Sequence, residues 1–150
     1  MLKGLDPLLT PELVKVLMQM GHDDTVVLAD ANFTAHRLAH GKPLIHLPGA
    51  GLVRVVQAVT SVLPLVADEK HPVGFMHVSG QSEGYLSALQ REVMHLLTPQ
   101  MLPGQSAQAI ERFAFYERTA SAFAIVLTGE LQPYGNFLLR KGVIGETLRP

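Results

Sequence analysis

The chain has 150 residues, a length that fits one domain with its own hydrophobic core. Its formal net charge of -1 comes without a basic cluster, which argues against nucleic acid and anionic membranes as partners. Because cysteine is absent, the chain cannot form disulfides, a thiolate nucleophile or a cysteine zinc site. Charged residues make up only 17%, below the average of roughly 25%, which indicates that part of the surface is covered by subunit contacts.

No segment has the pattern of a secretion signal or a membrane span. The opening M-L-K-G-L-D-P lacks a basic start followed by a continuous apolar run. The richest apolar segment, residues 52–67, is interrupted by Arg54, Gln57 and Pro64, so we do not expect it to cross a bilayer. We therefore expect a cytoplasmic protein with a single domain over residues 1–150.

The first expected element is a helix that begins at the T-P-E motif of residues 10–12. This motif places a hydroxyl N-cap before a proline and a carboxylate, all of which favour a helix start. Gly21 is expected to end the helix in a left-handed conformation. The β-branched run over 25–29 predicts a short buried strand, and a second short apolar stretch follows over 43–47.

The rest of the chain alternates between helical and strand patterns. We expect helices over 53–63, 85–97 and 113–121, strands over 73–78, 123–127 and 137–139, and a loop over 101–108. Alternating short apolar strands and helices predict an α/β fold, with a central, largely parallel sheet covered by helices. In such sheets ligands bind at the carboxyl ends of the strands, and Asp30 lies at that end of the first strand.

His22 directly follows the glycine that ends the first expected helix. It is either a capping or surface histidine or an acid–base group, since imidazole serves in all these roles. Asp23 and Asp24 are interpreted as solvated turn residues.

His22, Asp30 and His36 have side chains that can bind metals, but their spacing matches none of the compact metal motifs. We therefore expect no metal site. The remaining histidines are scattered and are expected to be structural or exposed. Among them, His77 ends an apolar strand and could face a pocket.

The segment R-F-A-F-Y-E-R over 112–118 is the densest mixture of aromatic and charged residues. As an amphipathic helix, it would bury Phe113 and Phe115 and pair Glu117 with an arginine at the surface. Arg112 and Tyr116 are four residues apart and share a helix face, so they could offer a guanidinium and a phenol to a polar ligand.

Tyr134, Gly135 and Asn136 follow a proline and precede the last expected strand. These residues form either a turn that enters the strand or a sugar contact, in which the ring meets C–H groups and the amide meets hydroxyls. Gly135 would also allow a ligand to approach the backbone.

Three separated motifs in this order resemble the D-ribose pyranase and L-fucose mutarotase family. The opening segment over 9–36 has a histidine after M-G and an aspartate that closes the strand. R-F-A-F-Y-E-R resembles the fucose branch, and A-F-A-I-V-L-T-G-E followed by Y-G-N and L-L-R-K-G-V-I resembles the C-terminal signature. The resemblance covers nearly the whole chain.

The resemblance implies a cofactor-free sugar mutarotase. It places the general acid on His22 and a further catalytic or binding group on Tyr116. The substrate-binding positions it implies are Asp30, Arg112, Tyr134, Gly135 and Asn136. It also implies a ring-forming oligomer, commonly a decamer, with sites near subunit contacts, and L-fucose as the substrate.

Three alternatives stay open at the level of the sequence. The same pocket could serve D-ribose or a related aldose, as in a D-ribose pyranase. It could also belong to a non-catalytic monosaccharide-binding or transport-accessory protein. A metal-dependent hydrolase or lyase built on His22 and His36 is a third class.

Overall fold

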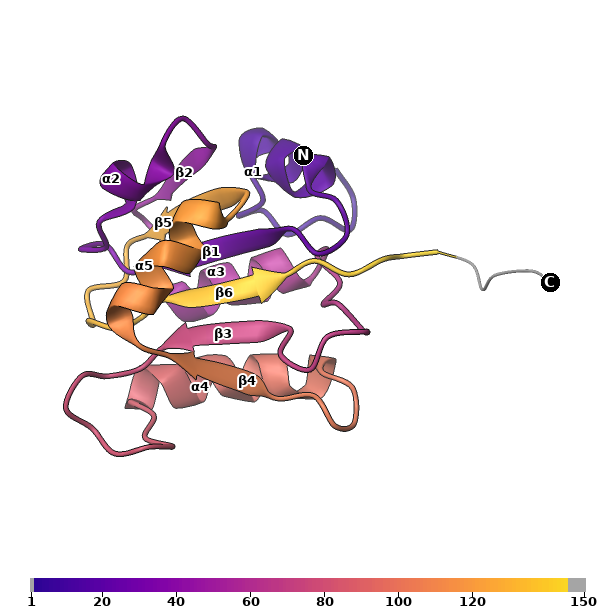
Figure 1. Ribbon diagram of the computed structural model, residues 1–150. Helices are drawn as coiled ribbons and strands as arrows, with labels where there is room; N and C mark the ends of the chain where they lie inside the picture. Colours follow the sequence, from indigo (N-terminus) through magenta and orange to yellow (C-terminus); the bar gives the residue numbers. More distant parts are fainter. Residues whose placement is uncertain (1, 146–150) are drawn as a thin grey trace.

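Six strands form one mixed sheet in the computed structural model, which describes residues 2–145 (Figure 1). Their order across the sheet is β2-β5-β1-β6-β3-β4. The strands are β1 (Thr25–Ala29), β2 (Leu44–Leu47), β3 (Val73–Met76), β4 (Ala107–Ile110), β5 (Ala124–Thr128) and β6 (Phe137–Arg140). Residue 1 and residues 146–150 of the expected domain lie outside the described residues.

Of the strands described, β6 is the one that runs against the others. β2, β5 and β1 pair in parallel, as do β3 and β4, whereas β6 is antiparallel to both of its neighbours, β1 and β3. Residues 129–136 connect β5 to β6 and are too few for the crossover helix that a parallel strand would need. The expected α/β class is confirmed, and the sheet is mixed because of this one reversed strand.

Helices cover both faces of the sheet (Figure 1). In the described part of the chain they are α1 (Pro11–Gln19), α2 (Ala35–Ala39), α3 (Leu52–Thr60), α4 (Ala88–Leu97) and α5 (Arg112–Ser121), with a 3-10 turn η1 (Thr98–Gln100) after α4. One hydrophobic core lies between the sheet and α1, α3 and α4, and a second lies between the sheet and α2 and α5. Within β1, Val26 and Leu28 face the first core while Val27 and Ala29 face the second, as the period of two in a strand requires.

Two elements differ from the sequence expectation. β4 occupies part of the expected loop over 101–108, because it is an edge strand in which only Ile110 is buried and the apolar pattern is therefore weak. α2 was not expected, since its five residues are too few to show a helical period.

The end of α1 corrects the role expected for Gly21. The helix ends at Gln19, its C-cap Met20 has an extended backbone, and the left-handed conformation falls on Asp23, with a φ of 69°. The ammonium group of Lys141 donates to the carbonyl oxygens of Leu17 (2.7 Å) and Met20 (2.5 Å). A side chain from the end of the chain thus satisfies carbonyls that a glycine cap would otherwise have served.

The two phenylalanines of α5 lie in different surroundings. Phe115 is fully buried in the second core, where its ring meets Phe33 edge to face at 6.0 Å. The expectation that Phe113 also fills the core is wrong, because its side chain is 60% exposed. The sequence predicts that Glu117 pairs with an arginine at the surface. Arg118 does not form this pair, because its guanidinium donates to Gln108 (2.8 Å).

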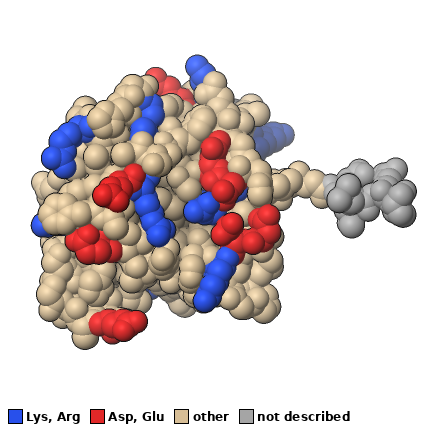
Figure 2. All heavy atoms as spheres, viewed as in Figure 1, with Lys and Arg blue, Asp and Glu red and all other residues tan. Residues whose placement is uncertain are grey.

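Acidic and basic side chains are interspersed over the face seen in Figure 2, with broad uncharged areas between them.

Within residues 2–145, no helix combines the length and the apolar character needed to pass through a lipid bilayer.

The contrast between the two phenylalanines gives a stability prediction with a built-in control. We expect Phe115→Ala to lower the free energy of unfolding by about 3–5 kcal/mol, because it leaves a cavity in the second core. Phe113→Ala should change it by less than about 0.5 kcal/mol, since the ring is mostly in solvent. Urea unfolding of both variants checks this, and equal losses would contradict the assignment of the core.

Candidate active site

A buried polar pair lies at the carboxyl edge of the sheet, where β1 ends and β6 begins. Asp30 follows β1 and is 4% exposed, and Asn136 precedes β6 and is 2% exposed. Their side chains meet because Leu28 is in register with Phe137 in the antiparallel ladder. The Asn136 amide donates to Asp30 Oδ2 (2.8 Å), and the Asp30 backbone N–H donates to Asn136 Oδ1 (3.1 Å).

Burial dominates the electrostatics of Asp30 and raises the pKa of its carboxyl above the ordinary value of 3.8. Hydrogen bonds from the Asn136 side chain and from the Asn32 and Gly135 backbones act in the opposite direction and lower this pKa. The negative charge of Glu130 raises it further. The result is a carboxyl group at a strand end that is fixed in orientation and holds its proton more tightly than a solvated aspartate.

The turn that delivers Asn136 is tightly built. Tyr134 has a left-handed backbone with a φ of 63°, which is uncommon and strained for a residue other than glycine. At Gly135 an added Cβ would lie 3.0 Å from Leu89 Cδ2 and 3.3 Å from the Gln132 carbonyl oxygen, so a larger residue would displace its neighbours. The structure therefore brings Tyr134, Gly135 and Asn136 to the same edge as Asp30.

Helix α5 starts at this edge as well, directly after β4. Its first residue, Arg112, is exposed, and its guanidinium lies over the Phe113 ring at 4.7 Å from the centroid. Tyr116 is half-buried and packs against Phe33 with ring centroids 5.7 Å apart. The Phe33 N–H donates to the Asp30 carbonyl (3.1 Å). Phe33 therefore contacts both the Tyr116 ring and the turn that holds Asp30.

His22 lies at the opposite edge of the sheet. It precedes β1, and the adjoining Asp23 N–H and Asp24 carbonyl bond to the backbone of Lys141 just after β6 (2.9 and 2.8 Å). β1 alone spans roughly 13 Å at about 3.3 Å per residue, so His22 and Asp30 do not touch within one chain. Within one subunit, Asp30 therefore cannot orient the His22 ring.

Asp68 is the carboxylate that His22 meets within its own chain, and sequence reasoning missed it. Its Oδ1 lies 3.2 Å from His22 Nε2, with the His22 side chain 47% and the Asp68 side chain 71% exposed. Asp68 lies in a loop that Gln105 holds by donating to the carbonyls of Val66, Ala67 and Glu69. No local pattern marks such a residue, because the contact joins positions 46 residues apart.

His36 and His77 are separate from both groups. The His36 ring lies 5.1 Å from the His46 ring, and His77 Nε2 bonds to the carbonyl oxygen of Gln81 (3.1 Å). Over residues 2–145, no group of three or more histidine or acidic side chains is placed to hold a metal ion. Within one chain, His22, Asp30 and His36 therefore do not form a common ligand set.

The raised pKa of Asp30 predicts a specific pH dependence of stability. The folded protein binds this proton more tightly than the unfolded chain, so the free energy of unfolding should fall as the pH rises from 3.8 to the raised pKa. Asp30→Asn, which does not titrate, should lack this fall. Urea unfolding between about pH 3 and about pH 7 compares the two proteins. A carbon-13 titration of Asp30 with a pKa at or below 3.8 would contradict the prediction.

Comparison with known proteins agrees with this fold. Residues 3–144 match the profile of the RbsD / FucU transport protein family. The L-fucose mutarotase of Glaesserella parasuis serovar 5 (strain SH0165) is 40% identical over 152 residues, which cover 95% of this chain and 96% of that protein. The fucose mutarotase of Homo sapiens is 40% identical over 146 residues, 95% of this chain and 94% of that protein.

A solved structure extends the match to three dimensions. The fucose mutarotase from Streptococcus pneumoniae, in complex with L-fucose, superimposes with a TM-score of 0.86 at 32% identity. The superposition covers 96% of this chain and 100% of that one. Sequence and fold agree over almost the whole length, and the chain belongs to the RbsD / FucU transport protein family.

Proposed function

We propose that this protein is an isomerase that interconverts the α and β anomers of L-fucose. The observation that carries the proposal is the near full-length similarity to fucose mutarotases, in sequence and in a fold whose relative was solved with L-fucose. The buried pair of Asp30 and Asn136 supports it, since a fixed carboxyl group beside a fixed amide suits the hydroxyls of a sugar. We place the protein in the cytoplasm.

Anomer exchange needs only the movement of protons. A base removes the proton of the anomeric hydroxyl, an acid protonates the ring oxygen, and the bond between that oxygen and the anomeric carbon breaks. The open aldehyde turns its carbonyl face and the ring closes by the reverse steps, so no group or electron is gained or lost. Histidine suits these steps because its ordinary pKa of about 6.5 lies close to operating pH.

The residues at the carboxyl edge supply the binding half of the proposed site. Asp30 Oδ1 accepts from the Asn32 N–H and Oδ2 accepts from the Asn136 amide. An ionised carboxylate retains further lone pairs for sugar hydroxyls. Asn136 and Tyr134 hold the ring from one side. Arg112 donates from the start of α5. Tyr116 packs against Phe33 in the turn that follows Asp30, and we assign it a catalytic or binding role.

His22 supplies the acid in this proposal, and it reaches the sugar from a second copy of the chain. His22 and Asp30 lie at opposite edges of one sheet, so only a second copy of the chain can bring a His22 beside Asp30. A contact that joins two different edges is heterologous, and such contacts close into rings when the rotation permits. We propose a ring of this kind, a decamer in keeping with the family, with each site shared between neighbours.

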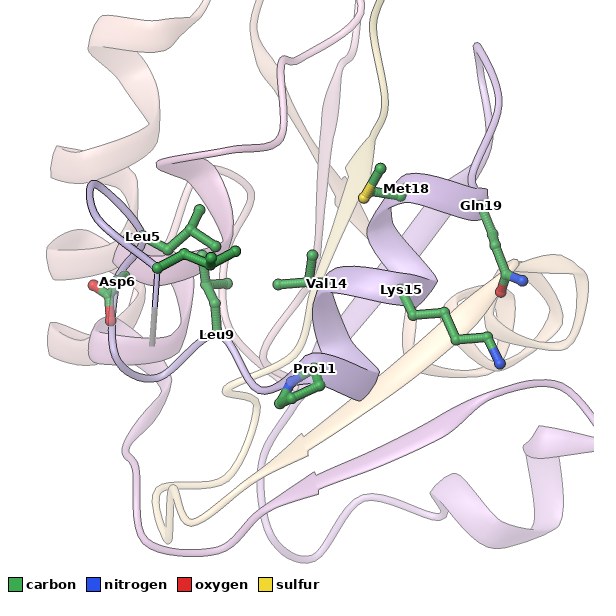
Figure 3. A pocket seen from close by; sticks show the side chains of 9 residues that line it. Leu5, Asp6, Leu9, Pro11, Val14, Lys15, Met18 and Gln19 are labelled. Atoms are coloured by element: carbon green, nitrogen blue, oxygen red, sulfur yellow. The ribbon is translucent and has the colours of Figure 1, made fainter.

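An apolar surface near the His22 edge supports self-association. A cavity of about 600 Å³ lies between the N-terminal segment and α1, with Leu5, Leu9 and Val14 directed into it (Figure 3). Met18 on α1 is 78% exposed, and Ile144 after β6 is 82% exposed. Exposed apolar groups in a patch of this kind commonly mark protein contacts.

The central test is anomer exchange measured by saturation-transfer NMR with L-fucose, D-ribose and D-galactose. We expect wild-type protein to accelerate exchange of L-fucose most. His22→Ala should reduce the acceleration by about 100-fold or more, the usual contribution of a positioned acid or base. His95→Ala is the matched control, because His95 is exposed on α4 and should leave the rate unchanged.

Each result of this test has a distinct meaning. Binding of L-fucose without accelerated exchange would favour a sugar-binding protein over an enzyme. Faster exchange of D-ribose would change the substrate but keep the chemistry. A His22→Ala variant with wild-type rates would remove His22 from the mechanism.

Sharing of sites between subunits is tested by mixing two inactive variants. In a ring assembled from equal amounts of His22→Ala and Asp30→Asn chains, about a quarter of the shared sites combine an intact His22 with an intact Asp30. We therefore expect co-assembly to restore about a quarter of wild-type activity, while each variant alone stays inactive. Co-assembled rings without restored activity would show that sites are not shared in this way.

A further inference from the structure

Gln90 is a fully buried residue in the first turn of α4, and both the oxygen and the nitrogen of its side-chain amide are hydrogen-bonded. It is the third residue of α4, where its Oε1 accepts from the Ser87 N–H (3.0 Å) while Ser87 Oγ accepts from the Gln90 N–H (3.2 Å). This reciprocal capping box explains why α4 starts at Ala88 rather than at Tyr85. Only the acceptor of the side-chain amide is needed for the cap, so its two N–H groups are free for other partners.

Those two N–H groups join the end of β3 to the turn that precedes β6. Gln90 Nε2 donates to the Met76 carbonyl (2.8 Å) and to the Tyr134 carbonyl (3.1 Å). The Met76 N–H in turn donates to the Asn136 carbonyl (3.0 Å). Both ends of the turn over 134–136 are thereby tied to Met76, one end directly and the other through Gln90.

The turn needs such a tie because its conformation is costly. Tyr134 holds a left-handed backbone, and Gly135 packs against Leu89, the neighbour of Gln90 on α4. Strained backbone persists only where surrounding contacts over-determine it. Without the donor from Gln90, the partly buried Tyr134 carbonyl would be unpaired, and this cost would favour relaxation of the turn.

We propose that Gln90 is a positioning residue, which clamps the turn so that Tyr134 and Asn136 are presented to the sugar. This inference rests on the proposed function for the identity of the ligand. The clamp itself is a property of the fold. Gln90 touches no substrate atom in this proposal and acts through the turn.

The test uses two Gln90 variants and one control. Gln90→Glu keeps an oxygen for the Ser87 N–H but, when ionised, cannot donate to either carbonyl. Gln90→Met removes the donors without adding a charge. Ser87→Ala weakens the same capping box and leaves both donors of Gln90 in place.

We expect both Gln90 variants to raise KM for L-fucose about tenfold and to change kcat by less than about threefold, since the clamp serves binding rather than proton transfer. Ser87→Ala should leave KM within about twofold of wild type. An unchanged KM in either folded Gln90 variant overturns the proposal, and so does an equal rise in Ser87→Ala. Circular dichroism verifies folding, and Gln90→Met carries the test alone if the charge of Gln90→Glu prevents folding.

Amide hydrogen exchange of residues 131–137 separates the clamp from the enzyme activity. Faster exchange in the Gln90 variants, but not in Ser87→Ala, is the expected result. Should wild-type protein accelerate no anomer exchange, the proposed function fails while this measurement still decides the clamp. Unchanged exchange in both Gln90 variants overturns it.

Discussion

The reversed strand β6 is the constraint on which the rest of the structure depends. Where β6 starts, it places Asn136 against Asp30, and where it ends, it places Lys141 against the segment that carries His22. Both candidate regions are therefore fixed by one short strand and are held apart by its length. A chain built in this way has its proposed binding groups and its proposed acid at opposite edges, which is why we propose that neighbouring subunits share each site.

Polar groups are concentrated at one edge of an otherwise apolar fold. Five polar residues are buried among those described, and four of them, Asp30, Gln90, Thr128 and Asn136, lie at the carboxyl edge. Burial of such groups is costly unless each finds a partner, and these side chains are hydrogen-bonded to one another or to backbone. The same desolvation that makes the pairing necessary raises the pKa of Asp30. A polar network inside an apolar layer fixes orientations more firmly than surface side chains would.

Sequence patterns predicted the elements with strong apolar periodicity and failed where that signal was weak. The strand over 25–29 was predicted with the bounds that β1 has, and the position of Asp30 at its carboxyl end was predicted with it. β4 was missed because only Ile110 in it is buried. Phe113 was assigned to the core because it is an apolar residue, although it faces solvent. Asp68 and Gln90 were missed as partners, since neither contact leaves a local pattern.

The sequence by itself determined the α/β class, the strand that ends at Asp30 and the family, because periodicity and short motifs are local properties. Only the tertiary structure decided which of these motifs meet. It paired Asp30 with Asn136 across 106 residues and set His22 at the far edge beside Asp68. Such meetings depend on the order and direction of the strands, above all on the reversal of β6. Strand order results from packing the whole chain at once, so no short segment encodes it.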